Sequence, residues 1–470
     1  MILKQYYLGC LSHASYLIAD EQTKTAVVVD PQRDIGQYLA DAAQRGLSIR
    51  HVFLTHFHAD FVAGHLELAQ ETGAAIRLGA RARADYAFTP MAEGQQLEFG
   101  SVRIGVLETP GHTPEGISLL VYDLQKNREQ PQAVLTGDTL FIGDVGRPDL
   151  MASIGITAAE LAGMLYDSLH EKLLKLPDET LLYPAHGAGS ACGKNLSKDT
   201  VSTIGAQRAG NCMLRPMSRA SFVEQLTQGQ PAAPRYFGYD AQLNKVERET
   251  LDASLARALH PLTLDELLAH RRAGGAVVDT RDSEEFAQAH LAGSLSIGLS
   301  GKYANWCGAL LDPAVPIALV ANPGRETESA TRLGRIGFDR IAGFLGGGFA
   351  PIAARKDLQA RFERLEPPQV FAGQQAGKLQ ILDVRGPGEF ESVRAEGALS
   401  IPLPELEARM NELPREGALA VICASGYRST IACSLLQRAG RGNLVDVRGG
   451  TAGWEQSGLP TARGAASCGR

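Results

Sequence analysis

Three side chains that can bind a metal lie close together in the sequence, at His56, His58 and Asp60. The apolar run at residues 51–55 predicts a buried strand that delivers them in the turn at its end. Imidazole nitrogens and carboxylate oxygens are ligands that iron and zinc accept. The next residue, Phe61, carries a phenyl ring that cannot ligate a metal. The motif therefore predicts one metal site, because a second site in the same turn would lack a ligand.

Further short apolar runs end in the same kinds of side chain. Residues 105–109, 133–136 and 180–183 read as buried strands, and a histidine or an aspartate follows each of them. Strands alternate with helical segments over residues 1 to about 205, so we expect the strand ends to converge on one edge of a sheet. This pattern predicts a metal constellation of His56, His58, Asp60, His112, Asp138 and His186. The other histidines, His13 and His65 among them, lack this context, and we interpret them as structural.

The four motifs at residues 55–60, 109–114, 136–144 and 183–186 resemble the metallo-β-lactamase fold. Within that fold they look like persulfide dioxygenases. The resemblance covers about the first 200 residues in the correct order. It implies an αββα architecture and an enzyme that uses one Fe(II) per chain.

Carried onto this chain, the resemblance implies that the iron ligands are His56, His112 and Asp138. Two histidines and one carboxylate on one face of Fe(II) leave open positions for a persulfide sulfur and O₂. The resemblance further implies that neighbouring groups orient the ligands and tune the iron. Those groups are His58, Asp60, His186 and Tyr183, of which Tyr183 is expected to donate a hydrogen bond near the open positions.

Two residues that follow Asp138 in the chain, Arg147 and Cys192, each have two possible interpretations. The resemblance suggests that Arg147 lies near the substrate, where it would suit the carboxylate of a glutathione-like persulfide. A pairing with Asp144 or Asp149 that shapes the loop is equally compatible. Cys192 follows in a loop of small residues and would be an accessory thiol that moves sulfur, or a buried, idle one.

A second reactive pattern begins at Cys423, where an apolar strand enters a loop of small residues and a helical pattern follows. Main-chain N–H groups at a helix start form an anion nest, which favours a thiolate or a persulfide anion. The loop resembles the rhodanese active loop, Cys-x-x-Gly-x-Arg, and residues 383–385 and 449–450 resemble other rhodanese landmarks. Tyrosine phosphatases space these residues more widely, and a purely structural cysteine is the other alternative. We interpret Cys423 as the nucleophile and assign anion binding to Ser425, Gly426, Tyr427, Arg428 and Ser429.

The same domain pattern occurs twice. Residues 277–281 match residues 381–385, and the offset of 104 residues recurs in two further matches. In the first copy Ala321 replaces the cysteine and Glu326 replaces the arginine. An alanine cannot carry sulfur and a glutamate repels an anion, so we expect an inactive domain that packs or spaces the others. Cys307 in this copy is interpreted as filling space.

Length and composition set the frame. A chain of 470 residues predicts roughly three domains. We place them in an α/β multidomain chain at 1–250 with an irregular linker from about 205 and a turn at 230–234, at 261–358, and at 368–465. The net charge of −6 is dispersed, which indicates neither nucleic acid nor a membrane surface as a partner. No apolar run approaches the roughly 18 residues of a membrane span.

The remaining expectations concern location and reaction. Seven irregularly spaced cysteines indicate reduced thiols, and with the absence of a secretory signal they predict a cytoplasmic protein. We expect the iron domain to oxidise a thiol persulfide to sulfite with O₂. Cys423 would exchange sulfane sulfur with thiosulfate or sulfite, in either direction. The partners are then small molecules, and we expect a homo-oligomer, a dimer or a tetramer. The alternative is a glyoxalase II-like thioester hydrolase with two metals, fused to a sulfur carrier.

Overall fold

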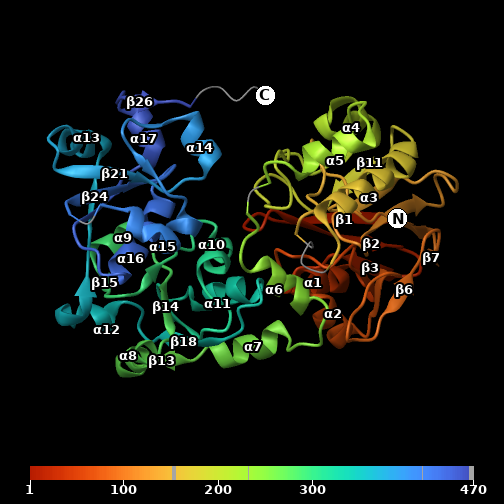
Figure 1. Ribbon diagram of the computed structural model, residues 1–470. Coiled ribbons are helices and arrows are strands. Elements are labelled where there is room, and N and C mark those ends of the chain that lie inside the picture. The colour runs from red at the N-terminus through yellow and green to blue at the C-terminus, as the bar shows by residue number, and fades with distance from the viewer. Residues whose placement is uncertain (151–154, 231, 415, 465–470) are drawn as a thin grey trace. The chain divides into compact units, whose positions relative to one another are not determined.

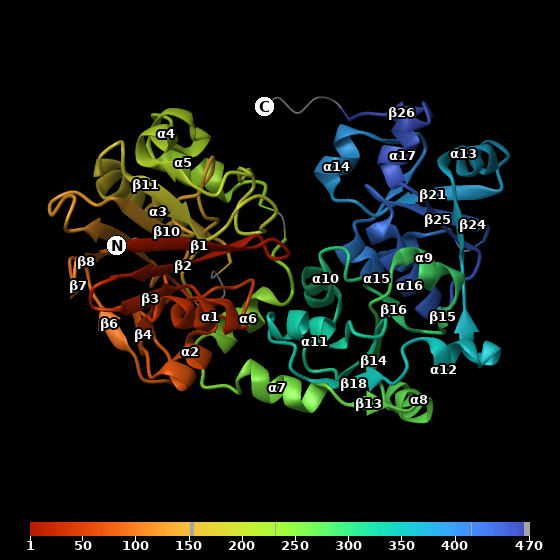
Figure 2. The same ribbon diagram turned by 180° about the vertical axis from the view of Figure 1, so that it is seen from behind.

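The computed structural model describes residues 1–150, 155–230, 232–414 and 416–464. The chain divides into two compact units (Figures 1 and 2). The first comprises Met1–Ser254 and Leu333–Phe338, and the second Leu255–Arg332 and Asp339–Arg470. Pro231 in the predicted turn, Cys468 and the predicted domain end at residue 465 lie outside the described residues.

The first unit contains two sheets that pack face to face. One has the order β1-β2-β3-β4-β5-β6, and the other has the order β12-β11-β10-β9-β8-β7. Their inner faces share a core that includes Tyr16, Phe53 and Leu119. The strands of the first sheet are β1 (Ile2–Leu8), β2 (His13–Ala19), β3 (Thr25–Val29), β4 (Ser48–Phe53), β5 (Ala75–Gly79) and β6 (Thr89–Met91). Those of the second are β7 (Gln96–Phe99), β8 (Val102–Glu108), β9 (Ile117–Asp123), β10 (Ala133–Gly137), β11 (Leu181–Pro184) and β12 (Ser202–Thr203).

Helices cover the outer faces of both sheets. Helices α1 (Gly36–Arg45) and α2 (His65–Thr72) lie on the first sheet, and α3 (Ala158–Glu171) lies on the second. The apolar face of α3 shares a second core with that sheet and with the helix at Arg219–Thr227. This arrangement is the predicted αββα architecture, and it confirms the fold class.

The strands that precede the metal-binding residues come from both sheets. In the second sheet β10 is parallel to β11, and both β8 and β10 are antiparallel to β9. Strands β8, β10 and β11 therefore run in the same direction. The residues after these three strands therefore meet at one edge. His56 follows β4, which belongs to the first sheet. The expectation of a single sheet edge was wrong, since the site lies where the two packed sheets end together.

The segment after residue 203 is helical rather than irregular, which corrects the expected linker. It contains α4 (Ile204–Gly210), α5 (Arg219–Thr227), α6 (Phe237–Leu243) and α7 (Leu251–Ala258). Asn244, at the end of α6, is buried and donates hydrogen bonds of 2.8 Å to the carbonyl oxygens of His58 and Phe61. Its side-chain oxygen accepts one from the Ala63 N–H at 2.8 Å. One amide thus holds the metal-binding turn in place.

The second unit contains two five-stranded parallel sheets with the same topology. Their orders, β13-β18-β17-β14-β16 and β20-β25-β24-β21-β23, place corresponding strands in corresponding positions. This equivalence confirms the duplication. The first copy has β13 (Pro261–Leu262), β14 (Ala276–Asp279), β16 (Leu295–Ser296), β17 (Ile317–Val320) and β18 (Ile341–Leu345). The second has β20 (Glu363–Leu365), β21 (Leu379–Asp383), β23 (Leu399–Ser400), β24 (Ala418–Ile422) and β25 (Leu444–Val447).

Each copy has its own helices and its own core. The first has α8 (Leu264–Arg272), α9 (Ser283–Gln288), α10 (Tyr303–Leu310), α11 (Glu326–Gly334) and α12 (Ala350–Ala353). The second has α13 (Pro367–Gln375), α14 (Pro387–Ser392), α15 (Leu406–Arg409), α16 (Tyr427–Arg438) and α17 (Gly450–Gln456). Separate two-stranded ribbons pair β15 (His290–Leu291) with β19 (Gln359–Ala360), and β22 (Arg394–Ala395) with β26 (Thr461–Ala462). A buried ion pair recurs as well, since Arg281 Nη2 and Arg385 Nη2 each lie 2.6 Å from the aspartate two residues earlier.

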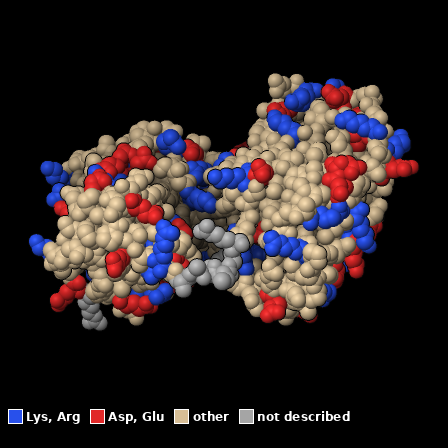
Figure 3. Space-filling model, turned by 90° about the horizontal axis from the view of Figure 1, so that it is seen from above, with Lys and Arg blue, Asp and Glu red and all other residues tan. Residues whose placement is uncertain are grey.

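The lengths of the helices and the distribution of charged side chains bear on the predictions from composition. Among the described residues no helix is both long and apolar enough to cross a membrane. Basic and acidic side chains are interspersed on the face displayed in Figure 3.

Replacing Asn244 tests its support of the metal-binding turn. Asn244→Ala leaves two carbonyl oxygens and one N–H of that turn buried without partners, so we expect it to lower the free energy of unfolding by about 2–4 kcal/mol. Hydrogen exchange measured by mass spectrometry should be faster for residues 56–63. The control Gln44→Ala changes an exposed residue of α1 and should leave both quantities unchanged. Equal exchange in the two variants would contradict the assignment.

Candidate functional site

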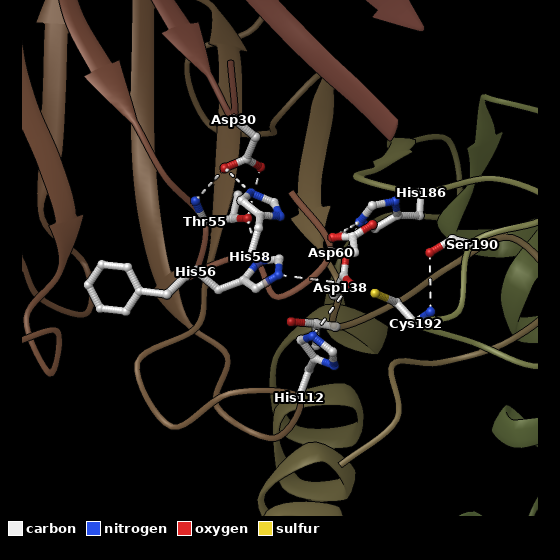
Figure 4. Close-up of polar contacts among 12 residues, drawn as sticks. Asp30, Thr55, His56, His58, Asp60, His112, Asp138, His186, Ser190 and Cys192 are labelled. Carbon is white, nitrogen blue, oxygen red and sulfur yellow. Dashed lines mark hydrogen bonds and ion pairs between the residues drawn. The ribbon is translucent and has the colours of Figure 1, made fainter. Parts of the chain in front are cut away.

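His56, His112 and Asp138 come together at the end of the two sheets, as Figure 4 shows. One ligand atom from each lies within 4.8 Å of the others, and all three residues are buried. Asp138 Oδ2 is 3.4 Å from His112 Nε2 and 3.8 Å from His56 Nε2. Two imidazole nitrogens and one carboxylate oxygen therefore face a common point.

The other nitrogen of each ring is anchored. His56 Nδ1 lies 2.9 Å from Thr55 Oγ1, and His112 Nδ1 lies 2.8 Å from the carbonyl oxygen of Arg147. Such a bond to Nδ1 fixes the ring and directs Nε2 toward a metal. Burial also holds the pKa of His56 well below its usual value, so the ring is neutral and its lone pair is available.

These residues fit a metal ion because the buried Asp138 carboxylate has no hydrogen-bond partner among the described residues and lies among imidazole nitrogens. Both of its oxygens are buried and accept no hydrogen bond among the described residues. A buried carboxylate without hydrogen bonds is costly unless a cation neutralises it. A divalent metal held by His56, His112 and Asp138 would supply that charge.

His58 is not part of this group, although one of its ring nitrogens lies within 4.8 Å of ligand atoms of Asp60 and His186. Its Nε2 lies 3.1 Å from Asp30 Oδ1, and Asp30 also accepts hydrogen bonds from the N–H and the hydroxyl of Thr55 at 2.7 and 2.8 Å. Asp30 thus organises the turn from the end of β3, with a left-handed φ of 50°. The arrangement suits an orienting role for His58, which remains a proposal.

A second set of polar groups lies on the opposite side of Asp138. His186 Nε2 is 3.5 Å from Asp60 Oδ1 and 3.6 Å from Asp138 Oδ1. The Phe61 ring is buried between the His13 and His58 rings, with centroid distances of 4.0 and 4.4 Å. Position 61 therefore adds apolar surface beside this set.

Arg147 and Cys192 are linked through the main chain. The Arg147 N–H donates to the Cys192 carbonyl oxygen at 3.1 Å. The Arg147 guanidinium is buried and donates to both carboxylate oxygens of Asp149, at 2.8 and 2.6 Å. This geometry favours the loop-shaping alternative for Arg147 over contact with a substrate carboxylate. Cys192 is buried with its sulfur turned toward Asp138, and burial raises the pKa of its thiol.

Tyr183 differs from its expected role. Its ring packs on the core between the sheets, 5.6 Å from the Tyr16 ring centroid. Among the described residues its hydroxyl makes no hydrogen bond to the metal-binding groups. Alternation along β11 explains this placement, because Tyr183 and the residues beside it point to opposite faces.

Cys423 lies at the end of β24 in the second unit, directly before α16. Its sulfur accepts a hydrogen bond from the Gly426 N–H at 3.1 Å and lies 3.5 Å from Ser429 Oγ. Gly426 adopts φ 98°, which turns the chain into the helix. Tyr427 and Ser425 flank this turn, with Ser425 exposed. The expected loop at a helix start is present around the sulfur.

Gly450 packs closely against the main chain of the Cys423 loop. The Thr451 N–H donates to the Cys423 carbonyl oxygen at 2.7 Å. A Cβ atom on Gly450 would lie 2.3 Å from that same oxygen, and the residue has φ +58°. Only glycine permits both the backbone conformation and the close approach.

Arg428 is neutralised by a neighbour rather than directed at the sulfur. Its two Nη atoms donate to the two oxygens of Glu389, at 2.7 and 2.6 Å. The guanidinium holds the pKa of Glu389 below its usual value. The assignment of Arg428 to anion binding stays a prediction, and an anion bound there would compete with Glu389.

Comparison with known proteins agrees with this architecture. The Metallo-beta-lactamase superfamily model matches residues 8–186. The chain is 30% identical to a metallo-beta-lactamase of known structure from Staphylococcus aureus subsp. aureus COL, with a TM-score of 0.65, over 73% of this chain and 98% of that one. This chain belongs to the metallo-β-lactamase superfamily. The Rhodanese-like domain model matches residues 263–355 and 366–457, so two rhodanese-like domains follow the metallo-β-lactamase domain.

Relatives of two kinds match the metallo-β-lactamase domain. The mitochondrial persulfide dioxygenase ETHE1 of Bos taurus is 26% identical over 245 residues, which cover 52% of this chain and 87% of that protein. The hydroxyacylglutathione hydrolase of Polaromonas sp. (strain JS666 / ATCC BAA-500) is 29% identical over 260 residues, covering 50% and 93%. Identity alone does not separate an oxygenase from a hydrolase here.

In the first rhodanese-like domain, a side chain of the domain itself binds to the loop that corresponds to the Cys423 loop. Its loop follows β17 as the Cys423 loop follows β24, and Ala321 occupies the position of the cysteine. The Gly324 N–H donates at 2.8 Å to the Glu326 carboxylate. A carboxylate of the protein thus occupies a donor that an anionic substrate would need.

Several residues of the site were not predicted from the sequence. Asn244 and His13 gave no signal, although His13 packs within the histidine cluster. Glu115 accepts a hydrogen bond from the Phe57 N–H at 3.0 Å. Asp30 had one usable signal, since a charged residue directly follows a buried apolar strand.

A pair of glycine substitutions tests the support of the Cys423 loop. Gly450→Ala combines a left-handed backbone with a main-chain clash, so it should destabilise the second unit by about 3–4 kcal/mol. Gly458→Ala, at φ +64° in open space, should cost only about 1 kcal/mol. Urea unfolding followed by tryptophan fluorescence measures this unit alone, because both tryptophans, Trp306 and Trp454, lie in it. Equal losses in the two variants would contradict the close approach.

Proposed function

We propose that the metallo-β-lactamase domain is an Fe(II)-dependent persulfide dioxygenase and that the second rhodanese-like domain is a sulfurtransferase. The observation that carries the first assignment is the group of two histidines and one carboxylate, with His58 turned to Asp30 and Phe61 beside it. A mononuclear iron with one anionic ligand suits O₂ chemistry. Small thiol persulfides, O₂, sulfite and thiosulfate would be the partners.

The proposed oxidation is RSSH + O₂ + H₂O → RSH + SO₃²⁻ + 2 H⁺. The outer sulfur is oxidised and O₂ is reduced, while the inner sulfur leaves as the thiol. Iron bound by His56, His112 and Asp138 would supply the electron transfer to O₂ that closed-shell persulfides do not achieve directly. The Arg147 carbonyl oxygen and the Thr55 hydroxyl keep the two imidazole rings in position.

A thioester hydrolase is the alternative, and relatives of that kind match as well as dioxygenases do. Two features of the described residues favour the dioxygenase. The position after Asp60 carries a phenyl ring, and His58 is engaged by an aspartate outside the His56–His112–Asp138 group. A thioester hydrolase with two metals would need His58 and the residue at position 61 as metal ligands.

For the sulfurtransferase, Cys423 would attack the outer sulfur of thiosulfate. The reaction Cys–S⁻ + S₂O₃²⁻ → Cys–S–S⁻ + SO₃²⁻ conserves charge. The Gly426 N–H donates to the Cys423 sulfur and would stabilise its negative charge. A thiol can then accept the outer sulfur. The reverse sequence begins with a persulfide and consumes the sulfite that the iron domain releases.

Oxygen uptake tests the first assignment. The full chain loaded anaerobically with Fe(II) should consume one O₂ per sulfite when supplied with glutathione persulfide, and His112→Ala should lose at least about 100-fold in rate. Cys423→Ser should retain this uptake and lose thiosulfate turnover. A zinc-loaded protein that hydrolyses a glutathione thioester, with no oxygen uptake by the iron form, would replace the dioxygenase with the hydrolase.

Glu389 tests the second assignment. Glu389→Gln frees Arg428 for the substrate dianion, so we expect the KM for thiosulfate to fall about threefold to tenfold with little change in kcat. The effect should shrink at high ionic strength. Glu285→Gln is the matched control, because Glu285 occupies the equivalent place in the other domain and caps its helix without facing an arginine. A similar fall in that control would refute the role of the ion pair.

A further inference from the structure

We propose that residues 333–338 are a positioning element of the metal-binding turn at residues 56–61, and that the reaction of the metallo-β-lactamase domain requires them. In sequence this segment lies inside the first rhodanese-like domain, between the last turn of α11 and the start of β18. It nevertheless belongs to the first compact unit. The requirement in the reaction rests on the dioxygenase function proposed above, whereas the positioning role does not.

The segment supplies a hydrogen-bond acceptor to the end of the metal-binding turn. Val62 directly follows Phe61 and is fully buried, and its N–H donates to the Arg335 carbonyl oxygen at 2.7 Å. The next N–H, that of Ala63, instead donates to Asn244 Oδ1. A buried N–H group without a partner is costly, so the Arg335 carbonyl fixes the position of the main chain directly after Phe61.

A buried arginine holds the main chain of the segment. The Arg33 Nη1 donates to the Gly334 carbonyl oxygen at 2.7 Å, and the Arg33 side chain is fully buried. Its Nε donates to Glu67 Oε1 at 3.1 Å, and its Nη2 donates to the Glu249 carbonyl oxygen at 2.9 Å. Glu67 lies on α2, the helix that follows the metal-binding turn. Arg33 therefore joins the segment to that helix.

The Arg335 side chain adds an ion pair. Its Nε and Nη2 donate to the two carboxylate oxygens of Asp34, at 2.8 and 2.6 Å. A bidentate pair of this kind fixes direction as well as distance. Asp34 follows β3, as does Asp30, whose carboxylate accepts the hydrogen bonds of Thr55. The segment is thus attached to both stretches of chain that shape the site.

Gly337 brings the segment into close contact with the turn. The residue has φ +67°, and a Cβ atom on it would lie 2.3 Å from Leu243 Cδ1 and 3.2 Å from Val62 Cγ2. The Tyr239 hydroxyl donates to the Gly337 carbonyl oxygen at 3.2 Å. Leu243 and Tyr239 both lie on α6, which ends directly before Asn244. Only glycine permits this backbone conformation together with this close approach.

These contacts give the first rhodanese-like domain a role that needs no nucleophile. Residues 1–254 contain the proposed metal ligands but not the acceptor for the Val62 N–H. That acceptor arrives through the continuous main chain between α11 and β18. The metal-binding turn is therefore complete only in a chain that contains this stretch of the first rhodanese-like domain.

Gly337→Ala in the full chain tests the segment. The added methyl group should displace the segment from Val62, so hydrogen exchange in peptides covering residues 58–64 should become about tenfold faster. The affinity for Co²⁺ should weaken about tenfold, since the turn carries His56 and groups that orient ligands contribute on this scale. Gly324→Ala is the matched control, because Gly324 lies in the same rhodanese-like domain at φ +86° with nothing within 4 Å of an added Cβ.

A second variant and two further readouts distinguish positioning from a loss of folding. Arg335→Ala should weaken Co²⁺ binding in the same direction, and Arg335→Lys should recover part of the affinity. Arg325→Ala, which removes an exposed ion pair with Glu328, should leave it unchanged. The visible spectrum of bound Co²⁺ should change in Gly337→Ala, and the kcat for O₂ uptake with Fe(II) should fall about tenfold. Thiosulfate turnover at Cys423 should be unaffected.

Equal hydrogen exchange and equal Co²⁺ affinity in Gly337→Ala and Gly324→Ala would overturn the proposal. A parallel loss of thiosulfate turnover in both Gly337→Ala and Arg335→Ala would overturn it as well, because the effect would not be specific to the metal-binding turn. If the unmodified chain loaded with Fe(II) consumes no O₂ while the exchange and cobalt results are as expected, only the dioxygenase function fails.

Discussion

The buried charge of Asp138 is the constraint on which the first domain depends. Its carboxylate lies where the two sheets end, faces three imidazole nitrogens and receives no hydrogen bond among the described residues. Burying such a charge costs several kcal/mol unless a cation neutralises it. The hydrogen bonds to the histidine Nδ1 atoms, the Asp30 contacts with Thr55 and the Asn244 amide keep the surrounding groups aimed at this point. The domain is therefore arranged around a buried charge that a bound metal would balance.

The sequence predicted the parts of this arrangement that depend on local pattern. Short apolar runs ending in His or Asp identified the strands, and the αββα fold and the duplicated rhodanese-like domains are confirmed. Residues 204–258 were misjudged because their helices are short and their apolar periodicity is weak. Asn244 could not be found in this way, since an asparagine after a short helix has no pattern that shows which distant carbonyl groups it meets.

The same limit applied to the chemistry of single side chains. Phe61 was correctly identified as a residue that cannot bind a metal, but the sequence does not show which distant side chain lies beside it. Cys192 is far from Asp60 along the chain and close to the same histidine in space. Arg428 was assigned to anion binding and instead meets a carboxylate of the chain, whereas for Arg147 the sequence left substrate contact and a pairing with Asp144 or Asp149 both open. Pairing between charged residues depends on tertiary position, so motif spacing does not predict it.

The first rhodanese-like domain contributes structure to the second although its own loop has no cysteine. Three residues of this domain contact side chains of α16. The Tyr427 hydroxyl donates to the Gly298 carbonyl oxygen at 2.7 Å, the Ser296 N–H donates to Ser434 Oγ at 3.1 Å, and His290 Nε2 lies 2.7 Å from Gln437 Oε1. These contacts follow the helix from its first turn to its last. Because the Gly426 N–H that bonds the Cys423 sulfur directly precedes this helix, holding α16 also holds the loop. The first rhodanese-like domain, whose own loop has no cysteine, thus contacts the helix that follows the Cys423 loop along its length.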